Sequence, residues 1–370
     1  MEIPTLIIII SLVLGLASGM IMHRSDFCLA GMFRDLFLFR SSPLLRSLLL
    51  LVVCSMVLFE VARLAGLLSP AVLYGTPSVS NLLGGALFGV GMVLAGGCVV
   101  GTLYKLGAGN TASASAFVGL LIGSTLYAEF HPYWKQFSSL TTYHQAVSVP
   151  QLLGVPPTSV FLVSAVLLGY ILVRWQLRGQ LIRLNRVPGY LQPRTAAVLL
   201  ALIGGLSFVL TGMPLGITTS YAKVGAFFEQ LAFPEHVAAL NYFQTQDFEY
   251  FSPLAKQVLT AGAGPFWDGL ALVQFPLIVG IVLGAGLSAC LLGKFQVRLN
   301  IPRIQLFSAL LGGILMGLAA RMAPSCNIWH LLGGLPLLSL NSILFALGLF
   351  PGAWFGTRIL SRYILRDPTS

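Results

Sequence analysis

Charged residues are scarce in this chain of 370 residues, where Asp, Glu, Lys and Arg together supply only 9%. Hydrophobic residues supply 56%, and the mean hydropathy is +0.88. This composition lies outside the range of soluble globular domains. The apolar runs lack the alternating polarity of transmembrane β-strands, which favours membrane-spanning helices. We therefore predict an all-α polytopic membrane protein.

Nine apolar runs approach the length that a helix needs to cross a bilayer. They cover residues 4–22, 44–66, 82–97, 113–128, 158–174, 195–212, 270–293, 306–322 and 339–357. The first run lacks the basic segment that precedes the apolar core of a signal peptide, so we expect a retained helix. We predict about nine transmembrane helices, with re-entrant or broken helices among them.

The net charge of +10 is distributed unevenly among the segments that connect these runs. Most Lys and Arg residues fall within residues 24–46, 174–194, 294–303 and 358–366. With nine crossings these segments share one side of the membrane, and the positive-inside rule makes that side cytoplasmic. We expect the N-terminus outside, the C-terminus in the cytoplasm, and lipid rather than nucleic acid around the chain.

The sequence contains an internal repeat that ends both times at a cysteine. "LLGGALFGVGMVLAGGC" ends at Cys98 and "LLGGILMGLAARMAPSC" ends at Cys326, with nearly half of the positions identical. A fainter pair joins "GMIMHRSDFCLAGMF" from Gly19 to "GMPLGITTSYAKVGAF" from Gly212. Spans 1–4 thus correspond to spans 6–9. Because five spans separate equivalent helices, the second copy is inverted in the membrane, an arrangement common in secondary transporters.

These repeats predict the organisation of the chain. Residues 1–176 form the first inverted repeat with spans 1–5, and residues 177–194 form a basic cytoplasmic linker. Residues 195–370 form the second repeat with spans 6–9, including a long outer loop at residues 213–268.

Three of the five cysteines lie where an apolar span is interrupted. Cys28, Cys98 and Cys326 follow charge, glycine or proline, and such breaks at membrane depth are tolerated only against protein or a water-filled cavity. A broken helix exposes N–H groups that suit an anion, and a thiol would add a contact for sulfur. We predict that these three cysteines line a substrate path, while Cys54 and Cys290 are packed and inert.

Further polar or flexible residues lie near the breaks and are predicted to support this path. They are Arg24, Gly96, Gly97, Thr218, Thr219, Ser220, Lys223, Arg321, Ser325, Asn327 and His330. Arg321 either attracts anions or pairs with an acid such as Glu60, because a charge inside a span is otherwise costly. The hydroxyls and ammonium of residues 218–223 suit sulfonate-like oxygens, although an ordinary polar helix start would look the same. Arg24 equally fits a role in topology, with Asp26 paired to an arginine.

Two other chemistries are possible for the cysteines. The absence of a CxxC motif disfavours a thiol-disulfide oxidoreductase, although distant cysteines could still pair. A soft-metal transporter lacks support because the five histidines are dispersed and no compact ligand spacing exists. We predict no catalytic residues, no cofactor and no metal site.

Four motifs, in order, resemble the YeeE/YedE family of sulfur transport proteins. They are "HRSDFCLAG", "GGALFGVGMVLAGGCVVG", "PLGITTSYAKVGAF" and "GLAARMAPSCNIWHLLGG", and the resemblance covers nearly the whole chain. It implies thiosulfate uptake across the bacterial inner membrane through an hourglass-shaped interior with inverted halves. It also implies that Cys28, Cys98 and Cys326 are essential and hand thiosulfate along through S–H contacts.

The resemblance further implies a small cytoplasmic sulfur-carrier protein of the TusA type as a partner. One departure concerns Pro324 and Ser325, because family members more often carry glycines before that cysteine. This difference leaves another sulfur or selenium species open as the substrate.

Overall fold

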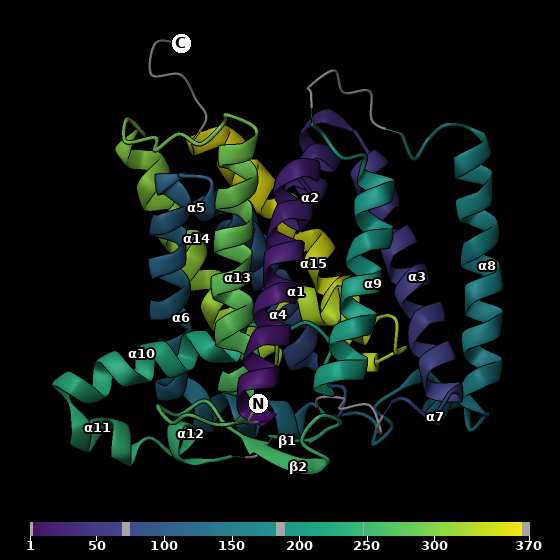
Figure 1. Ribbon diagram of the computed structural model, residues 1–370. Coiled ribbons are helices and arrows are strands. Elements are labelled where there is room, and N and C mark those ends of the chain that lie inside the picture. The colour runs from purple at the N-terminus through teal and green to yellow at the C-terminus, as the bar shows by residue number, and fades with distance from the viewer. Residues whose placement is uncertain (1–2, 69–74, 183–188, 247, 365–370) are drawn as a thin grey trace.

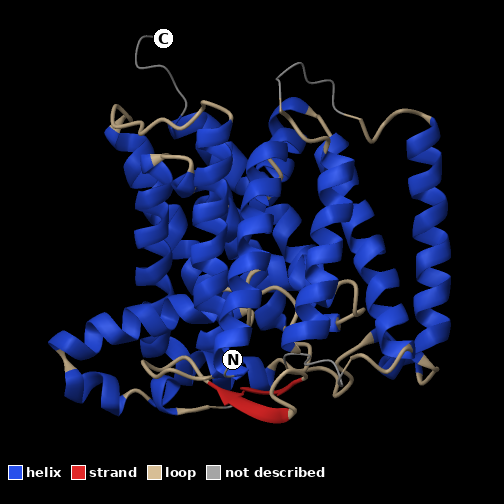
Figure 2. Ribbon diagram, in the orientation of Figure 1, coloured by secondary structure: helices blue, strands red, loops and turns tan. Residues whose placement is uncertain are grey.

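The computed structural model describes residues 3–68, 75–182, 189–246 and 248–364. Within these ranges, nine helical segments are long and apolar enough to cross a membrane. They are Ile3–Phe39, Pro43–Leu64, Val79–Gly107, Thr111–Leu140, Pro157–Leu177, Pro193–Thr211, Gly269–Leu291, Arg303–Met322 and Leu340–Ile364. Figures 1 and 2 show a helical bundle, which confirms the predicted all-α polytopic class.

Eight helices lie within the described residues before the linker. They are α1 (Ile3–Ser25), α2 (Leu29–Phe39), α3 (Pro43–Leu64), α4 (Val79–Leu94), α5 (Val99–Gly107), α6 (Thr111–Leu140), α7 (Val149–Leu153) and α8 (Pro157–Leu177). The predicted linker at 177–194 joins α8 to α9 (Pro193–Thr211), and its residues 183–188 lie outside the described ranges.

After α9 come α10 (Thr218–Ala232), α11 (Pro234–Ala239) and α12 (Asn241–Gln244). The membrane-spanning helices α13 (Gly269–Leu291), α14 (Arg303–Met322) and α15 (Leu340–Ile359) complete the bundle. Two π-helical turns, Trp329–Gly334 and Leu360–Ile364, lie on either side of α15 in the sequence.

The predicted outer loop at 213–268 contains short helices and a pair of strands. Besides α10, α11 and α12, it holds strands β1 (Phe248–Ser252) and β2 (Gln257–Ala261). The strands pair antiparallel, with Phe248 opposite Ala261, and lie at the end of the bundle where α1 begins (Figure 2). The sequence analysis did not anticipate this hairpin.

Four helical segments are interrupted at residues that adopt positive φ. Asp26 separates α1 from α2 with φ 50°, and Gly96 separates α4 from α5 with φ 69°. Gly212 follows α9 with φ 83°, and Ser325 follows α14 with φ 123°. Because a residue with positive φ lies outside right-handed helical geometry, each of these residues lies in the break and not in a helix. The predicted breaks are therefore present in the structure.

The bundle is held together by long helix pairs that join the two parts of the chain. α1 packs along α13 and α3 along α9, while α4 packs along α15 and α6 along α14 (Figure 1). Glycine permits this close packing. A Cβ on Gly85 of α4 would lie 2.9 Å from the carbonyl carbon of Phe345, and one on Gly313 of α14 would lie 3.0 Å from the Cα of Gly119. The two copies of "LLGG" thus place a glycine at equivalent helix crossings.

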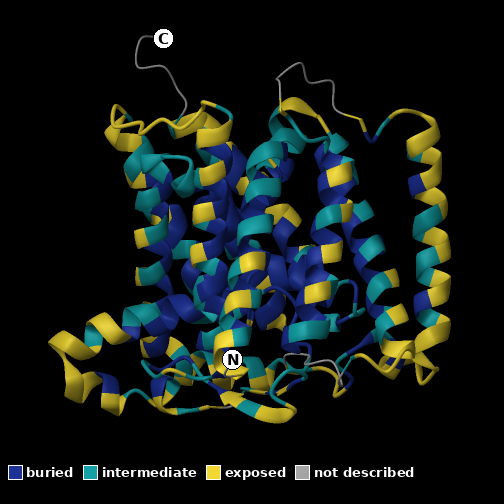
Figure 3. Cartoon of the chain, viewed as in Figure 1, coloured by how far each residue is buried: buried dark blue, intermediate teal, exposed yellow. Residues whose placement is uncertain are grey.

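Basic residues mark one end of the bundle, which we call the basic face. Lys105 lies in the last turn of α5, Arg174 in that of α8 and Arg358 in that of α15. These helix ends lie together at the top of Figure 1. Helix α8 stands at the margin and is largely exposed, whereas the central helices are largely buried (Figure 3).

Candidate functional site

Cys28 and Cys98 each stand immediately before a short helix, at the breaks that precede α2 and α5. Both are buried, and the Sγ of Cys98 accepts a hydrogen bond from the backbone N–H of Gly101 at 3.3 Å. A Cβ on Gly101 would lie 2.7 Å from the Sγ of Cys28 and 3.3 Å from the Sγ of Cys98. The two thiols therefore meet over a position that needs glycine. Sequence analysis missed Gly101 as part of the site, although its spacing places it one turn after Cys98.

Cys326 precedes the helical turn that begins at Asn327 and is fully buried. It belongs to the same hydrophobic cluster as Cys28 and Cys98. Tyr221 of α10 lies in that cluster too, within electrostatic reach of both Cys98 and Cys326. The structure thus brings the three predicted cysteines into one buried region.

The other two cysteines differ from them in environment. Cys54 of α3 is half-buried at the margin of the central cluster, and Cys290 of α13 is exposed. The prediction that both are packed is wrong for Cys290, because its place on α13 faces outward from the bundle. All five cysteines are free thiols.

A buried positive charge lies at the start of α10. Arg321 of α14 is only 7% exposed, and its guanidinium donates to the hydroxyl of Thr218 and, at 3.0 Å, to that of Thr219. Among the described residues it forms no ion pair with a carboxylate. The alternative of a pair with Glu60 is wrong, because Glu60 binds Arg63 one helical turn away on α3 at 2.6 Å. An uncompensated buried cation is costly and attracts an anion.

Two other residues of α10 serve to hold the structure together. Ser220 donates from both its N–H and its hydroxyl to the Oε1 of Gln274 on α13, each at 3.0 Å. Lys223 forms a buried ion pair with Asp268 at 2.7 Å and donates to the carbonyl oxygens of Gly264 and Phe266. These bonds attach α10 to α13 and to the segment before it. A role for either residue in contacting substrate stays a prediction.

The break after α14 contains both satisfied and unsatisfied polar groups. His330 is fully buried, with Nδ1 2.9 Å from the hydroxyl of Ser342, Nε2 3.5 Å from the carbonyl oxygen of Ala323, and its ring stacked on Phe345. Its ring nitrogens are therefore occupied within the protein. Asn327 is also fully buried, yet neither atom of its amide has a hydrogen-bond partner among the described residues. Ser325 is 7% exposed and supplies the turn.

A cavity of about 350 Å³ lies at the breaks between α1 and α2 and between α4 and α5, since Asp26 and Gly96 line it. Its lining includes His23, Asp26, Gly96, Tyr104, Lys105 and Lys294. Tyr104 donates to Asp26 at 2.9 Å, so this carboxylate pairs with a phenol and not with an arginine as expected.

Two of the predicted supporting residues, Gly96 and Arg24, lie at or near this cavity. Lys105 donates to the carbonyl oxygen of Gly96 at 2.6 Å. Arg24 lies beside His23 and donates to Ser288 at 3.4 Å. Gly97 has little room for a side chain, because an added Cβ would lie 3.2 Å from the backbone nitrogen of Thr102.

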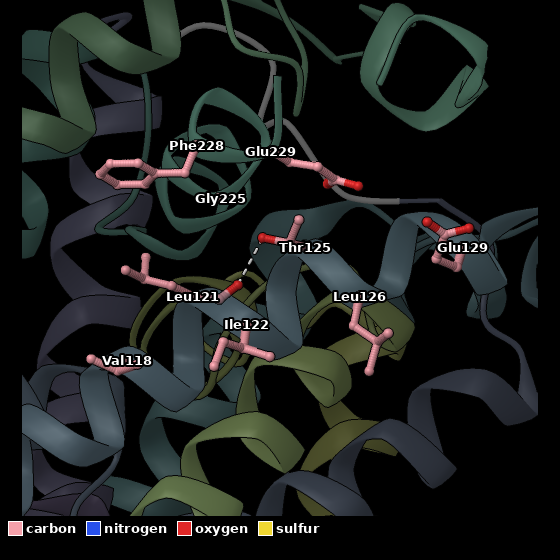
Figure 4. Close-up of a pocket in the computed structure, with 9 residues that line it drawn as sticks. All are labelled: Val118, Leu121, Ile122, Thr125, Leu126, Glu129, Gly225, Phe228 and Glu229. Atoms are coloured by element: carbon pink, nitrogen blue, oxygen red, sulfur yellow. Dashed lines mark hydrogen bonds between the residues drawn. The ribbon is translucent and has the colours of Figure 1, made fainter. Parts of the chain in front are cut away.

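A second pocket, of about 470 Å³, lies between α6 and α10 (Figure 4), and α10 lies at the end of the bundle opposite the basic face (Figure 1). Its lining is mainly apolar and includes no cysteine. Glu129 and Glu229 at its margin approach His236, whose Nε2 lies 2.6 Å and 3.3 Å from their respective carboxylate oxygens. This trio could hold a cation, a grouping that the sequence analysis did not foresee, but its ion pairs already account for the geometry.

Residues 24–355 match the protein family described as sulphur transport. The chain belongs to this family. The matched region contains all three cysteine-bearing breaks, and the family inferred from the four motifs is confirmed. The chain is 29% identical to the thiosulfate transporter TsuA of Spirochaeta thermophila, over 95% of this chain and 98% of that protein.

A second relative of this family is the thiosulfate transporter TsuA of Escherichia coli K12, 28% identical over 87% of this chain and 85% of that protein. The probable transporter YedE of the same organism is 28% identical over 48% of this chain and 39% of its own length. Because the matched family is described as sulphur transport and two of these relatives are named transporters, the chain is a sulfur transporter of the membrane and not an oxidoreductase.

Proposed function

We propose that the protein takes up thiosulfate across the bacterial inner membrane, with its N-terminus outside and the basic face in the cytoplasm. Two relatives that align with most of this chain are named thiosulfate transporters, which supports the substrate. The gathering of Lys and Arg at one end of the bundle supports the orientation, because cytoplasmic segments of membrane proteins are enriched in these residues.

The proposed architecture consists of two inverted halves, residues 1–176 and 195–370, joined by the linker. The helix pairs support it. In the repeat, α1, α3, α4 and α6 are equivalent to α9, α13, α14 and α15. Exchanging equivalent helices turns the α1 and α13 pair into the α9 and α3 pair. The same exchange turns the α4 and α15 pair into the α14 and α6 pair. A site at the interface of such halves lies near the middle of the membrane.

The proposed path passes the thiols of Cys28, Cys98 and Cys326. The N-terminal turns of α2, α5 and α10 carry the positive ends of helix dipoles, and Arg321 adds a charge without a carboxylate partner among the described residues. Thiols are weak hydrogen-bond donors. A series of weak contacts allows an anion to enter and also to leave. The observation that carries the proposal is the burial of all three thiols in one cluster at helix breaks.

Entry of an anion into the cytoplasm is opposed by the membrane potential, so uptake needs either ion coupling or consumption of the substrate. We propose that a TusA-like sulfur carrier consumes it at the basic face. The cavity lined by Lys105 and Lys294 would then be the exit from the narrow centre.

The test is uptake of radiolabelled thiosulfate into membrane vesicles. Replacing Cys28, Cys98 or Cys326 singly by Ala should lower uptake severely. Cys54→Ala and Cys290→Ala are matched controls and should retain it, because these thiols lie outside the proposed path. Wild-type uptake in all three of the first variants would reject the cysteine path.

Competition distinguishes thiosulfate from other small sulfur and selenium anions. Unlabelled thiosulfate should suppress uptake of the label more strongly than equal concentrations of sulfate, sulfite or selenite. Stronger suppression by selenite than by thiosulfate would move the assignment to a selenium species.

A further inference from the structure

The fourth helix break differs from the other three because it has no cysteine. Helix α10 begins after Ile217, which is buried and apolar. One turn into this helix comes Tyr221, whose side chain is 1% exposed. Besides the hydroxyls that bind Arg321 and Gln274, α10 therefore brings a phenolic hydroxyl, and not a thiol, into the buried region.

The Tyr221 hydroxyl has no hydrogen-bond partner among the described residues. Buried polar groups are nearly always paired in folded proteins, so an unpaired one needs an explanation. A serine or threonine in a helix can turn its hydroxyl toward a carbonyl of the preceding turn. The long, rigid side chain of Tyr221 carries its hydroxyl away from its own backbone, so its partner has to come from elsewhere.

The position of the ring suggests what that partner is. The Tyr221 ring packs edge-on against Phe117, with centroids 5.5 Å apart and planes at 88°, which fixes its direction. The Tyr221 hydroxyl is close enough to interact electrostatically with two cysteines, Cys98 of the first half of the chain and Cys326 of the second half. Two further buried groups without described partners, the Thr102 hydroxyl and the Asn327 amide, lie on the turns that follow these two cysteines.

We propose that Tyr221 contacts the substrate and donates a hydrogen bond to an oxygen of the sulfur oxyanion as it passes between Cys98 and Cys326. This inference rests on the proposed function. A phenol is a stronger donor than a thiol and suits the oxygen end of the anion, while the thiols contact its sulfur end. The pair of contacts orients the anion and selects for species that carry both sulfur and oxygen.

The test compares Tyr221→Phe with Tyr250→Phe, two substitutions that each remove one buried phenolic hydroxyl. Tyr250 of β1 donates to the carbonyl oxygen of Gly269 at 2.9 Å, so its hydroxyl has a structural partner. Tyr221→Phe should lower thiosulfate uptake into vesicles about tenfold or more, the effect of losing a hydrogen bond to a charged group. Its melting temperature should stay the same or rise, because an unpaired hydroxyl leaves the core. Tyr250→Phe should show the opposite pattern, with a lower melting temperature and retained uptake.

A binding measurement separates substrate contact from indirect effects. Thiosulfate should raise the melting temperature of the purified wild-type protein, and this rise should shrink in Tyr221→Phe at equal ligand concentration. Wild-type uptake by Tyr221→Phe would overturn the inference while leaving the cysteine path intact. A fall in its melting temperature equal to that of Tyr250→Phe would also overturn it, since the hydroxyl would then have a structural partner. Absence of uptake by the wild-type protein would instead remove the proposed function.

Discussion

Replacing Gly101 by Ala tests how tightly the two thiols of the first half are held. The added Cβ would lie 2.7 Å from the Sγ of Cys28 and 3.3 Å from the Sγ of Cys98. Both distances are shorter than an ordinary contact of 3.4–4 Å. One thiol has to move for the methyl group to fit. Overpacking of this kind costs about 1–3 kcal/mol. Replacing a helical glycine by alanine recovers roughly 0.5–1 kcal/mol.

We expect Gly101→Ala to lose most thiosulfate uptake and to have a slightly lower melting temperature. Gly169→Ala is the matched control, since Gly169 lies within α8 and an added Cβ there would meet no atom within 4 Å. This control should gain stability and keep its uptake. Both variants can be measured by vesicle uptake and by thermal unfolding of the purified protein.

A double substitution identifies the cause of any loss. Combining Gly101→Ala with Cys28→Ala removes the sulfur that the methyl group meets, so the stability cost of the glycine change should vanish in that background. Uptake should stay low, because a path thiol is missing. If Gly101→Ala behaves like Gly169→Ala in both assays, the close approach of Cys28 and Cys98 over Gly101 is not what uptake requires.

Two further predictions concern charges outside the thiol cluster. Lys223→Met leaves Asp268 buried without its cation and should destabilise the protein by about 3–5 kcal/mol. Adding Asp268→Asn should restore uptake and part of the stability, because it removes the buried charge but leaves one acceptor oxygen where Asp268 uses two, for Gly262 and Ala271. Low uptake by the folded double variant would support the predicted role of Lys223 in the substrate path. Burial, aided by the neighbouring Glu129, raises the pKa of Glu229, so the folded protein binds that proton more tightly than the unfolded chain and loses stability as pH rises. Glu229→Gln should therefore raise the melting temperature at pH 7. It should not raise it at a pH below the ordinary glutamate pKa of about 4.3, where the carboxyl is protonated in both states. An equal rise at neutral and at acidic pH would show that ionisation of Glu229 is not the cause.

Much of the architecture could be predicted because a membrane restricts the possible structures. The nine apolar runs correspond to the nine spanning segments, since only a helix satisfies its own backbone in lipid. The repeated motif ending at Cys98 and Cys326 located two helix breaks, because glycine and proline act locally on the backbone. The hairpin of β1 and β2 was missed, since strands of five residues carry a much weaker signal than a long apolar run.

The roles of individual polar residues could not be read in the same way. Nothing local to Lys223 indicates that Asp268 neutralises it, and nothing near Arg321 indicates that Glu60 binds Arg63 instead. Asp268 precedes α13 while Lys223 lies on α10, and Glu60 is bound by Arg63 of its own helix and so is not available to Arg321. The Lys223 pairing depends on a distance that is set only when the elements pack, whereas Glu60 and Arg63 lie one turn apart on α3 and their spacing alone allows the pair.

The sequence by itself determined the membrane class, the number of spans, the helix breaks and the family, because hydropathy, glycine placement and motifs are properties of neighbouring residues. Tertiary structure alone decided that Cys28 and Cys98 meet over Gly101, that Arg321 reaches Thr218 and that the Tyr221 hydroxyl is left unpaired among the described residues. These features join residues far apart in the chain. Their contacts are fixed by how closely the helices pack, and no short stretch of sequence encodes that distance.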